Sequence, residues 1–66
     1  MRLTINGKLC NAKKVETVTE LLNDLKIEPN RVAVEVNLSI VKKDAYSTFR
    51  LNEGDKVEIV NFVGGG

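Results

Sequence analysis

The first twelve residues, MRLTINGKLCNA (1–12), place Asn6-Gly7 between two short apolar segments. An Asn-Gly pair is the strongest short signal for a β-hairpin, because both residues accept the positive φ angles of a type I′ turn. Side chains alternate between the two faces of a strand, so a two-residue turn also determines which residues lie together. The expected register gives the core face four apolar residues: Met1, Leu3, Cys10 and Ala12.

The next segment has the pattern of a helix that begins at a capping box. In Thr17-Val18-Thr19-Glu20, the threonine and glutamate side chains can bind amide groups of the first turn. Apolar residues then recur at helical spacing, at Val18, Leu21, Leu22 and Leu25. This stripe predicts a helix that covers the hairpin's apolar face. Pro29 is expected to end the helix, because it disfavours helical geometry at Glu28.

Three further strands are predicted. Residues 32–36, VAVEV, alternate and are rich in β-branched side chains, which indicates a strand with inward valines. A turn at 37–39 leads to a short edge segment, Ile40-Val41. Tyr46 and Phe49 are expected to close one end of the core. The last strand, Lys56 to Val63, should place Phe62 on the face opposite Val57 and Ile59.

This order of elements predicts an α+β fold: a mixed sheet of four to five strands packed on one helix. The domain is expected to span residues 1–63, followed by a flexible C-terminal glycine tail at 64–66. With 66 residues, such a domain buries only about 60% of the surface that its unfolded chain exposes. Little interior is left for an enclosed active site.

Composition excludes several classes of function. Ten basic and nine acidic residues are mixed along the chain, so no nucleic-acid footprint is expected. No apolar run is long enough for a membrane span, and residues 1–7 do not resemble a signal peptide. One cysteine cannot form an internal disulfide. A cytoplasmic protein is therefore expected.

Most catalytic arrangements are also missing. The chain has no histidine, which excludes histidine-dependent triads and the usual zinc sites, and no catalytic residue or bound cofactor or metal is predicted. Cys10 is expected to be a buried, inert thiol, because its register turns it toward the core. Glu53 and Asp55 lie in a predicted surface turn and are interpreted as solubilising.

The remaining chemical group is the carboxylate of Gly66. Gly64, Gly65 and Gly66 have no Cβ and lose much backbone entropy on ordering, so they are expected to form a thin tail that threads into partner active sites. A carboxylate is a poor electrophile until it is joined to AMP, which removes its charge and supplies a leaving group. The alternative is a flexible end or a truncation scar.

Together, the Asn6-Gly7 hairpin, the capped helix, the valine strand and the ending VEIVNFVGGG (57–66) resemble the β-grasp, ubiquitin-like sulfur carriers of thiamine biosynthesis. The resemblance covers the whole chain, and the apolar strand that runs into glycines is its specific part. The β-grasp order alone would be weak evidence, since that fold has many functions.

The resemblance implies a protein co-substrate and not an enzyme. A ubiquitin-activating-type adenylyltransferase would use ATP and Mg²⁺ to convert Gly66 to an acyl adenylate. A persulfide donor such as a cysteine desulfurase would then supply the sulfur of a thiocarboxylate. Thiazole synthase would take that sulfur to build the thiazole ring. Phe62, beside the tail, is the residue predicted to contact a partner; packing against the helix is the alternative.

Other readings stay open at this stage. The small subunit of molybdopterin synthase shares the fold, the tail and the sulfur chemistry, although this chain is short for it. A carrier that serves another sulfur pathway remains a candidate. A protein modifier joined through Gly66 to lysines is a different class, and a passive interaction domain is a third.

Overall fold

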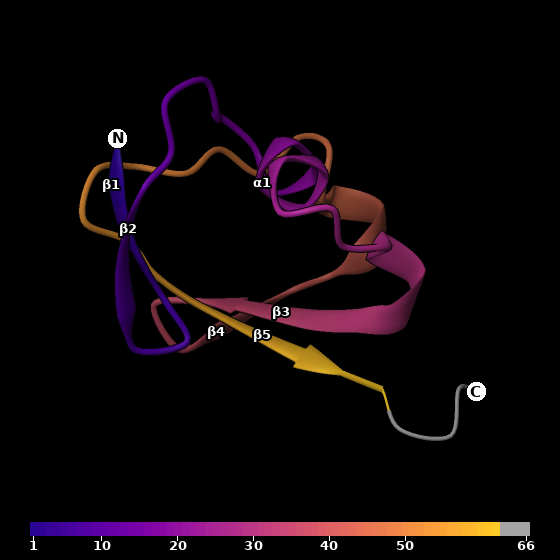
Figure 1. The fold of residues 1–66 in the computed structure, drawn as a ribbon. Coiled ribbons are helices and arrows are strands. Elements are labelled where there is room, and N and C mark those ends of the chain that lie inside the picture. The colour runs from indigo at the N-terminus through magenta and orange to yellow at the C-terminus, as the bar shows by residue number, and fades with distance from the viewer. Residues whose placement is uncertain (63–66) are drawn as a thin grey trace.

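The computed structural model describes residues 1–62. These form one five-stranded mixed sheet in the order β2-β1-β5-β3-β4, with helix α1 across one face (Figure 1). The α+β arrangement expected from the sequence is therefore confirmed. The elements are β1 (Arg2–Ile5), β2 (Lys8–Asn11), α1 (Val18–Asp24), the 3₁₀ helix η1 (Pro29–Arg31), β3 (Val32–Val36), β4 (Ser39–Val41), the 3₁₀ helix η2 (Lys43–Ala45) and β5 (Lys56–Asn61).

The first hairpin has the predicted register, with Leu3 opposite Cys10. Both turn residues have positive φ, 50° at Asn6 and 82° at Gly7, as a type I′ turn requires. Leu3 and Ala12 are buried in the core. Cys10 is only partly buried, so the prediction of a buried thiol is wrong. It lies on β2, the outermost strand, where the sheet ends and solvent reaches one side.

The capping box at the start of α1 is confirmed. The Thr17 hydroxyl accepts from the Glu20 amide at 3.2 Å, and the Glu20 carboxylate accepts from the Thr17 amide at 3.2 Å. The buried face of α1 consists of Val18, Leu21 and Leu22. These side chains pack against the valines of β3 and the hairpin residue Leu3 in a single core cluster.

The predicted end of the helix is wrong. The helix stops at Asp24, and Lys26 adopts a left-handed conformation with φ of 60°. The amides of Lys26 and Ile27 donate to the carbonyls of Asn23 and Leu22, which is the pattern of a Schellman motif. Ile27 packs against the core, and this burial favours the early turn. Leu25 consequently leaves the buried stripe and is 38% exposed. Pro29 opens η1 instead.

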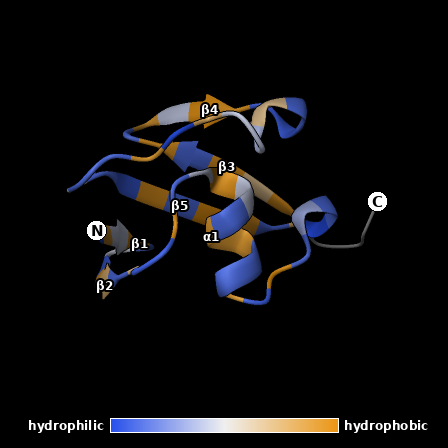
Figure 2. Cartoon of the chain, turned by 90° about the horizontal axis from the view of Figure 1, so that it is seen from above, coloured by the Kyte–Doolittle hydropathy of each residue, from blue (hydrophilic) through white to orange (hydrophobic). Residues whose placement is uncertain are grey.

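Strands β3 and β5 supply the centre of the sheet. Val32, Val34 and Val36 are buried as predicted, and Val57 is completely buried on β5. Figure 2 shows hydrophobic and hydrophilic residues alternating along both strands, so that one face packs under α1. Beyond β4, Tyr46 closes the core and donates its hydroxyl to the Val32 carbonyl.

Two predictions about the later part of the chain need correction. Phe49 is 36% exposed and does not close the core with Tyr46. Strand β5 ends at Asn61, and Val63, to which it was expected to extend, lies beyond the described part. None of the helices within residues 1–62 has the length and apolar character needed to cross a membrane.

Candidate functional site

The candidate site is the carboxyl end of β5 and the chain that follows it. Gly64, Gly65 and Gly66, the expected tail with its modified residue, lie outside the described residues. Phe62 is the last residue before them for which the structure gives a position. The environment of Phe62 and of the end of β5 therefore defines the part of the site that can be described.

The backbone is held to the sheet up to Phe62. Strand β3 pairs antiparallel with β5 as far as the Val32–Asn61 pair. One step further, the Phe62 amide donates to the Arg31 carbonyl at 2.8 Å, although neither residue belongs to a strand. The segment before the glycines thus starts from a fixed position at the sheet's centre.

Asn6 fixes the other side of β5. Its side-chain amide donates to the Ile59 carbonyl at 3.1 Å and accepts from the Ile59 amide at 2.7 Å. Its own backbone amide donates to the Val57 carbonyl at 2.9 Å. The sequence predicts Asn6 only as a turn residue. The contact joins positions 53 residues apart, and no local pattern signals it.

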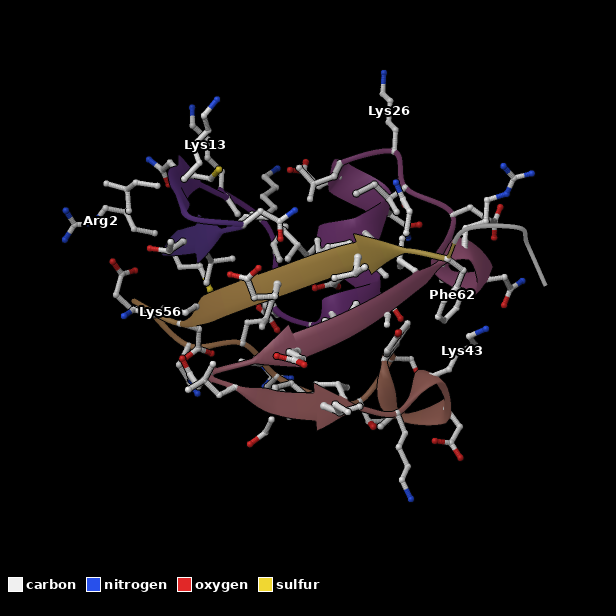
Figure 3. The ribbon with its side chains drawn as sticks, turned by 90° about the horizontal axis from the view of Figure 1, so that it is seen from below. Arg2, Lys13, Lys26, Lys43, Lys56 and Phe62 are labelled. Atoms are coloured by element: carbon white, nitrogen blue, oxygen red, sulfur yellow. The ribbon has the colours of Figure 1, made fainter. Side chains whose placement is uncertain are left out.

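Phe62 is 50% exposed and lies near the side chain of Lys43, as Figure 3 shows. The Lys43 ammonium is 5.9 Å from the centre of the Phe62 ring, within the range of a cation–π contact. Val60, two residues earlier, is 60% exposed. The end of β5 therefore presents apolar surface beside a positive charge. Partner contact through Phe62 remains a prediction.

The carboxylates of the turn before β5 are structural. Asp55, interpreted as solubilising, is buried instead, and it accepts from the Asn37 side chain at 2.9 Å and the Asn52 amide at 2.8 Å. Glu53 is exposed, and hydrogen bonds from the Arg2 backbone amide and guanidinium lower the pKa of its carboxyl group. These contacts fix the start of β5, at the end of the strand away from Phe62.

Two further features of residues 1–62 involve polar groups, the Tyr46 phenol and a surface depression. Burial raises the pKa of the Tyr46 phenol, whose hydroxyl is used within the core. Within residues 1–62, no group of three or more His, Cys, Asp or Glu side chains is arranged to hold a metal ion. An open depression of about 480 Å³ lies between the hairpin and the start of α1. Its lining includes Lys13, which is at the opposite end of the molecule from Phe62 (Figure 3).

Comparison with known proteins identifies close relatives. The model of the ThiS family matches residues 3–66. The chain is 42% identical over 65 residues to the sulfur carrier protein ThiS of Bacillus subtilis, covering 97% of this chain and 98% of that protein. It is also similar to a crystal structure of the thiamine biosynthesis protein ThiS from Geobacter metallireducens, with a TM-score of 0.85, 39% identity and complete coverage of both chains. This structural similarity confirms the β-grasp fold.

A second kind of relative is much longer. The chain is 48% identical over 66 residues to a thiazole synthase of Paramagnetospirillum magneticum. The match covers all of this chain and only 20% of that protein. A thiazole synthase of Magnetococcus marinus matches in the same way, at 39% identity and 20% coverage. The chain thus spans about a fifth of the length of these relatives.

Proposed function

Because the chain belongs to the ThiS family, we propose that it is a sulfur carrier of thiamine biosynthesis whose working group is the Gly66 carboxylate. The observation that carries the proposal is the family match, which runs through β5 and includes the glycine end. The relatives named ThiS and thiazole synthase favour the thiamine branch over molybdopterin synthase.

Both steps of the proposed chemistry involve the Gly66 carboxyl group. A Gly66 carboxylate oxygen attacks the α-phosphorus of ATP on a ubiquitin-activating-type adenylyltransferase, with Mg²⁺ bound there, and pyrophosphate leaves. The terminal sulfur of a persulfide, formed by a cysteine desulfurase or a related donor, then attacks the acyl adenylate and AMP leaves. A thiol cleaves the resulting S–S bond, and a thiocarboxylate remains on Gly66.

The carrier's own contribution is delivery. It performs no catalysis, and thiazole synthase consumes the sulfur. Gly64 and Gly65 precede the reacting residue and lack side chains, so they can enter a narrow channel without steric conflict. The fixed end of β5 presents this segment from the centre of the sheet. We place the carrier in the cytoplasm, where ATP is available for activation.

Intact-mass spectrometry tests the proposal. The chain is incubated with the adenylyltransferase, ATP, Mg²⁺ and a persulfide donor. The expected product is a monomer whose mass matches replacement of one oxygen by sulfur. A ladder of conjugates with other proteins would instead indicate a protein modifier, and an unchanged mass with partners that load another carrier would reject both readings.

Phe62→Ala is expected to weaken binding to the adenylyltransferase by roughly tenfold or more, because a large exposed aromatic side chain at an interface often contributes 1–2 kcal/mol or more. Its effect on stability should be small, since the ring is half exposed. Titration calorimetry and thermal unfolding measure the two effects. Leu38→Ala, 90% exposed in the β3–β4 turn, is the matched control. A large drop in melting temperature with unchanged affinity would contradict the prediction.

Cys10→Ser is expected to leave sulfur transfer largely intact. Cys10 is partly buried on β2, and its thiol contacts only the Lys8 carbonyl, at 3.5 Å, among the hydrogen bonds of the described residues. It has no histidine to activate it, as the chain contains none. Thiocarboxylate formation by mass is the measurement. Loss of loading in a variant that unfolds at the wild-type temperature would show that the thiol takes part.

A further inference from the structure

The edge of β5 that faces β1 is paired by two different means along its length, first by the backbone of the hairpin and then by the Asn6 side chain. In an antiparallel ladder, backbone groups of alternate residues point to opposite sides of the strand. The Phe62 amide bonds to Arg31, and the Asn37 amide bonds to the Lys56 carbonyl. The even-numbered residues of β5 therefore bond toward β3. The odd-numbered residues direct their N–H and C=O groups toward β1.

Backbone atoms of the first hairpin satisfy the first part of this edge. The Thr4 amide donates to the Asp55 carbonyl at 3.0 Å, and the Asn6 amide donates to the Val57 carbonyl at 2.9 Å. The hairpin turns back at Asn6-Gly7, so β1 cannot pair any further along β5. At Ile59 the Asn6 side chain replaces the missing strand and bonds to both the amide and the carbonyl.

Asn61 is the next odd-numbered residue of β5, and its backbone groups are not paired in either of these ways. No residue within 1–62 offers a partner to its backbone N–H or C=O on this side. The residue as a whole is exposed. An exposed strand edge with unpaired backbone groups is a template for an additional strand. We refer to these two groups as the Asn61 edge.

The site of the reaction lies close to this edge. Gly66 is five residues beyond Asn61, and a fully extended chain of that length reaches at most about 18 Å. Any enzyme that encloses the Gly66 carbonyl must therefore come close to Asn61. Val60 and Phe62, which flank Asn61, are both at least half exposed and offer apolar contacts to an arriving segment.

We propose that an extended segment of thiazole synthase pairs with the Asn61 edge and continues the line of β1 beyond Asn6. The inference rests on the proposed function. Thiazole synthase is the chosen occupant because two thiazole synthases contain a region similar to this chain. The pairing holds the segment before the glycines in an extended form, which aims the tail into the active site.

Backbone hydrogen exchange and two substitutions test the inference, with thiazole synthase from the same organism as the probe. The Asn61 amide should exchange rapidly in the isolated chain and become protected in the complex. Asn61→Pro removes an N–H that has no hydrogen-bond partner within residues 1–62, and proline is tolerated at such edge positions. It should weaken binding at least about tenfold, since it also blocks the approaching strand. Asn61→Ala, which keeps the N–H, should bind within about twofold of wild type.

The outcomes separate this inference from the proposed function. If wild type binds thiazole synthase but Asn61→Pro binds as well as Asn61→Ala, the strand pairing is wrong and the carrier function stands. If wild type itself does not bind, the thiazole branch of the function fails, and the inference fails with it. Protection of the Asn61 amide only in a complex with the adenylyltransferase would also overturn the choice of partner. Should Asn61→Pro unfold, the exchange of the wild-type amide decides alone.

Discussion

A chain that lacks Gly66 is expected to lose sulfur loading by at least about a hundredfold. The truncated chain still ends in a glycine carboxylate, so the reacting group is present and only its position changes. One residue of extended chain spans about 3.3–3.6 Å, and a displacement of 1 Å from the reacting geometry can cost roughly a hundredfold in rate. The rate of thiocarboxylate formation, followed by intact mass, measures the effect.

Growth of a cell that must make its own thiazole provides a second measurement. Cells that carry only the truncated chain should require added thiazole, and cells with the wild-type chain should not. Leu38→Ala serves as the control for expression and handling, because its side chain is exposed in the β3–β4 turn. Wild-type loading by the truncated chain would refute the assignment of Gly66.

Leu22→Ala is expected to remove a large part of the domain's stability. Leu22 is completely buried on the core face of α1. Truncating a buried leucine typically costs about 2–5 kcal/mol, because the lost contacts leave a cavity. A domain of 66 residues has a total stability of about 3–10 kcal/mol, so one such change removes a large part of it.

Urea unfolding followed by circular dichroism measures this loss. Leu9→Ala removes the same atoms from a side chain that is 69% exposed on β2, and its effect should stay within about 0.5 kcal/mol. Equal unfolding midpoints for the two variants would contradict the position of Leu22 in the core. Sulfur loading should fall with the folded fraction.

The parts of the fold that were predictable from the sequence are governed by local rules. Asn6-Gly7 specifies a two-residue turn, and that turn length fixes the register of the whole hairpin. Thr17 and Glu20 satisfy each other's backbone amides within one turn of helix, so four residues suffice to locate its start.

The errors arose where tertiary packing decides between local alternatives. Pro29 is a valid stop signal, but the helix had already ended at Asp24, because Ile27 packs against the core when the chain turns at Lys26. The exposure of Cys10 depends on β2 being an outer strand. Sequence periodicity does not specify the order of strands in a sheet.

The same distinction between local sequence signals and tertiary contacts applies to the candidate site. Gly64, Gly65 and Gly66 were identifiable because three consecutive glycines at this position have few structural uses. The contacts that position them were not, since Asn6 reaches Ile59 across 53 residues and Lys43 approaches Phe62 from another part of the chain. Such contacts require the topology that brings β5 between β1 and β3.

The central place of β5 also has a mechanical consequence. Under the proposed function a partner binds the chain beyond β5, so a load from that partner would reach β5 at its carboxyl end, where the strand lies between its neighbours β1 and β3. In this geometry the load acts on the hydrogen bonds to β1 and β3 at the same time, so they do not break one after another. We therefore expect the domain to keep its fold when a partner binds and releases the segment that follows β5.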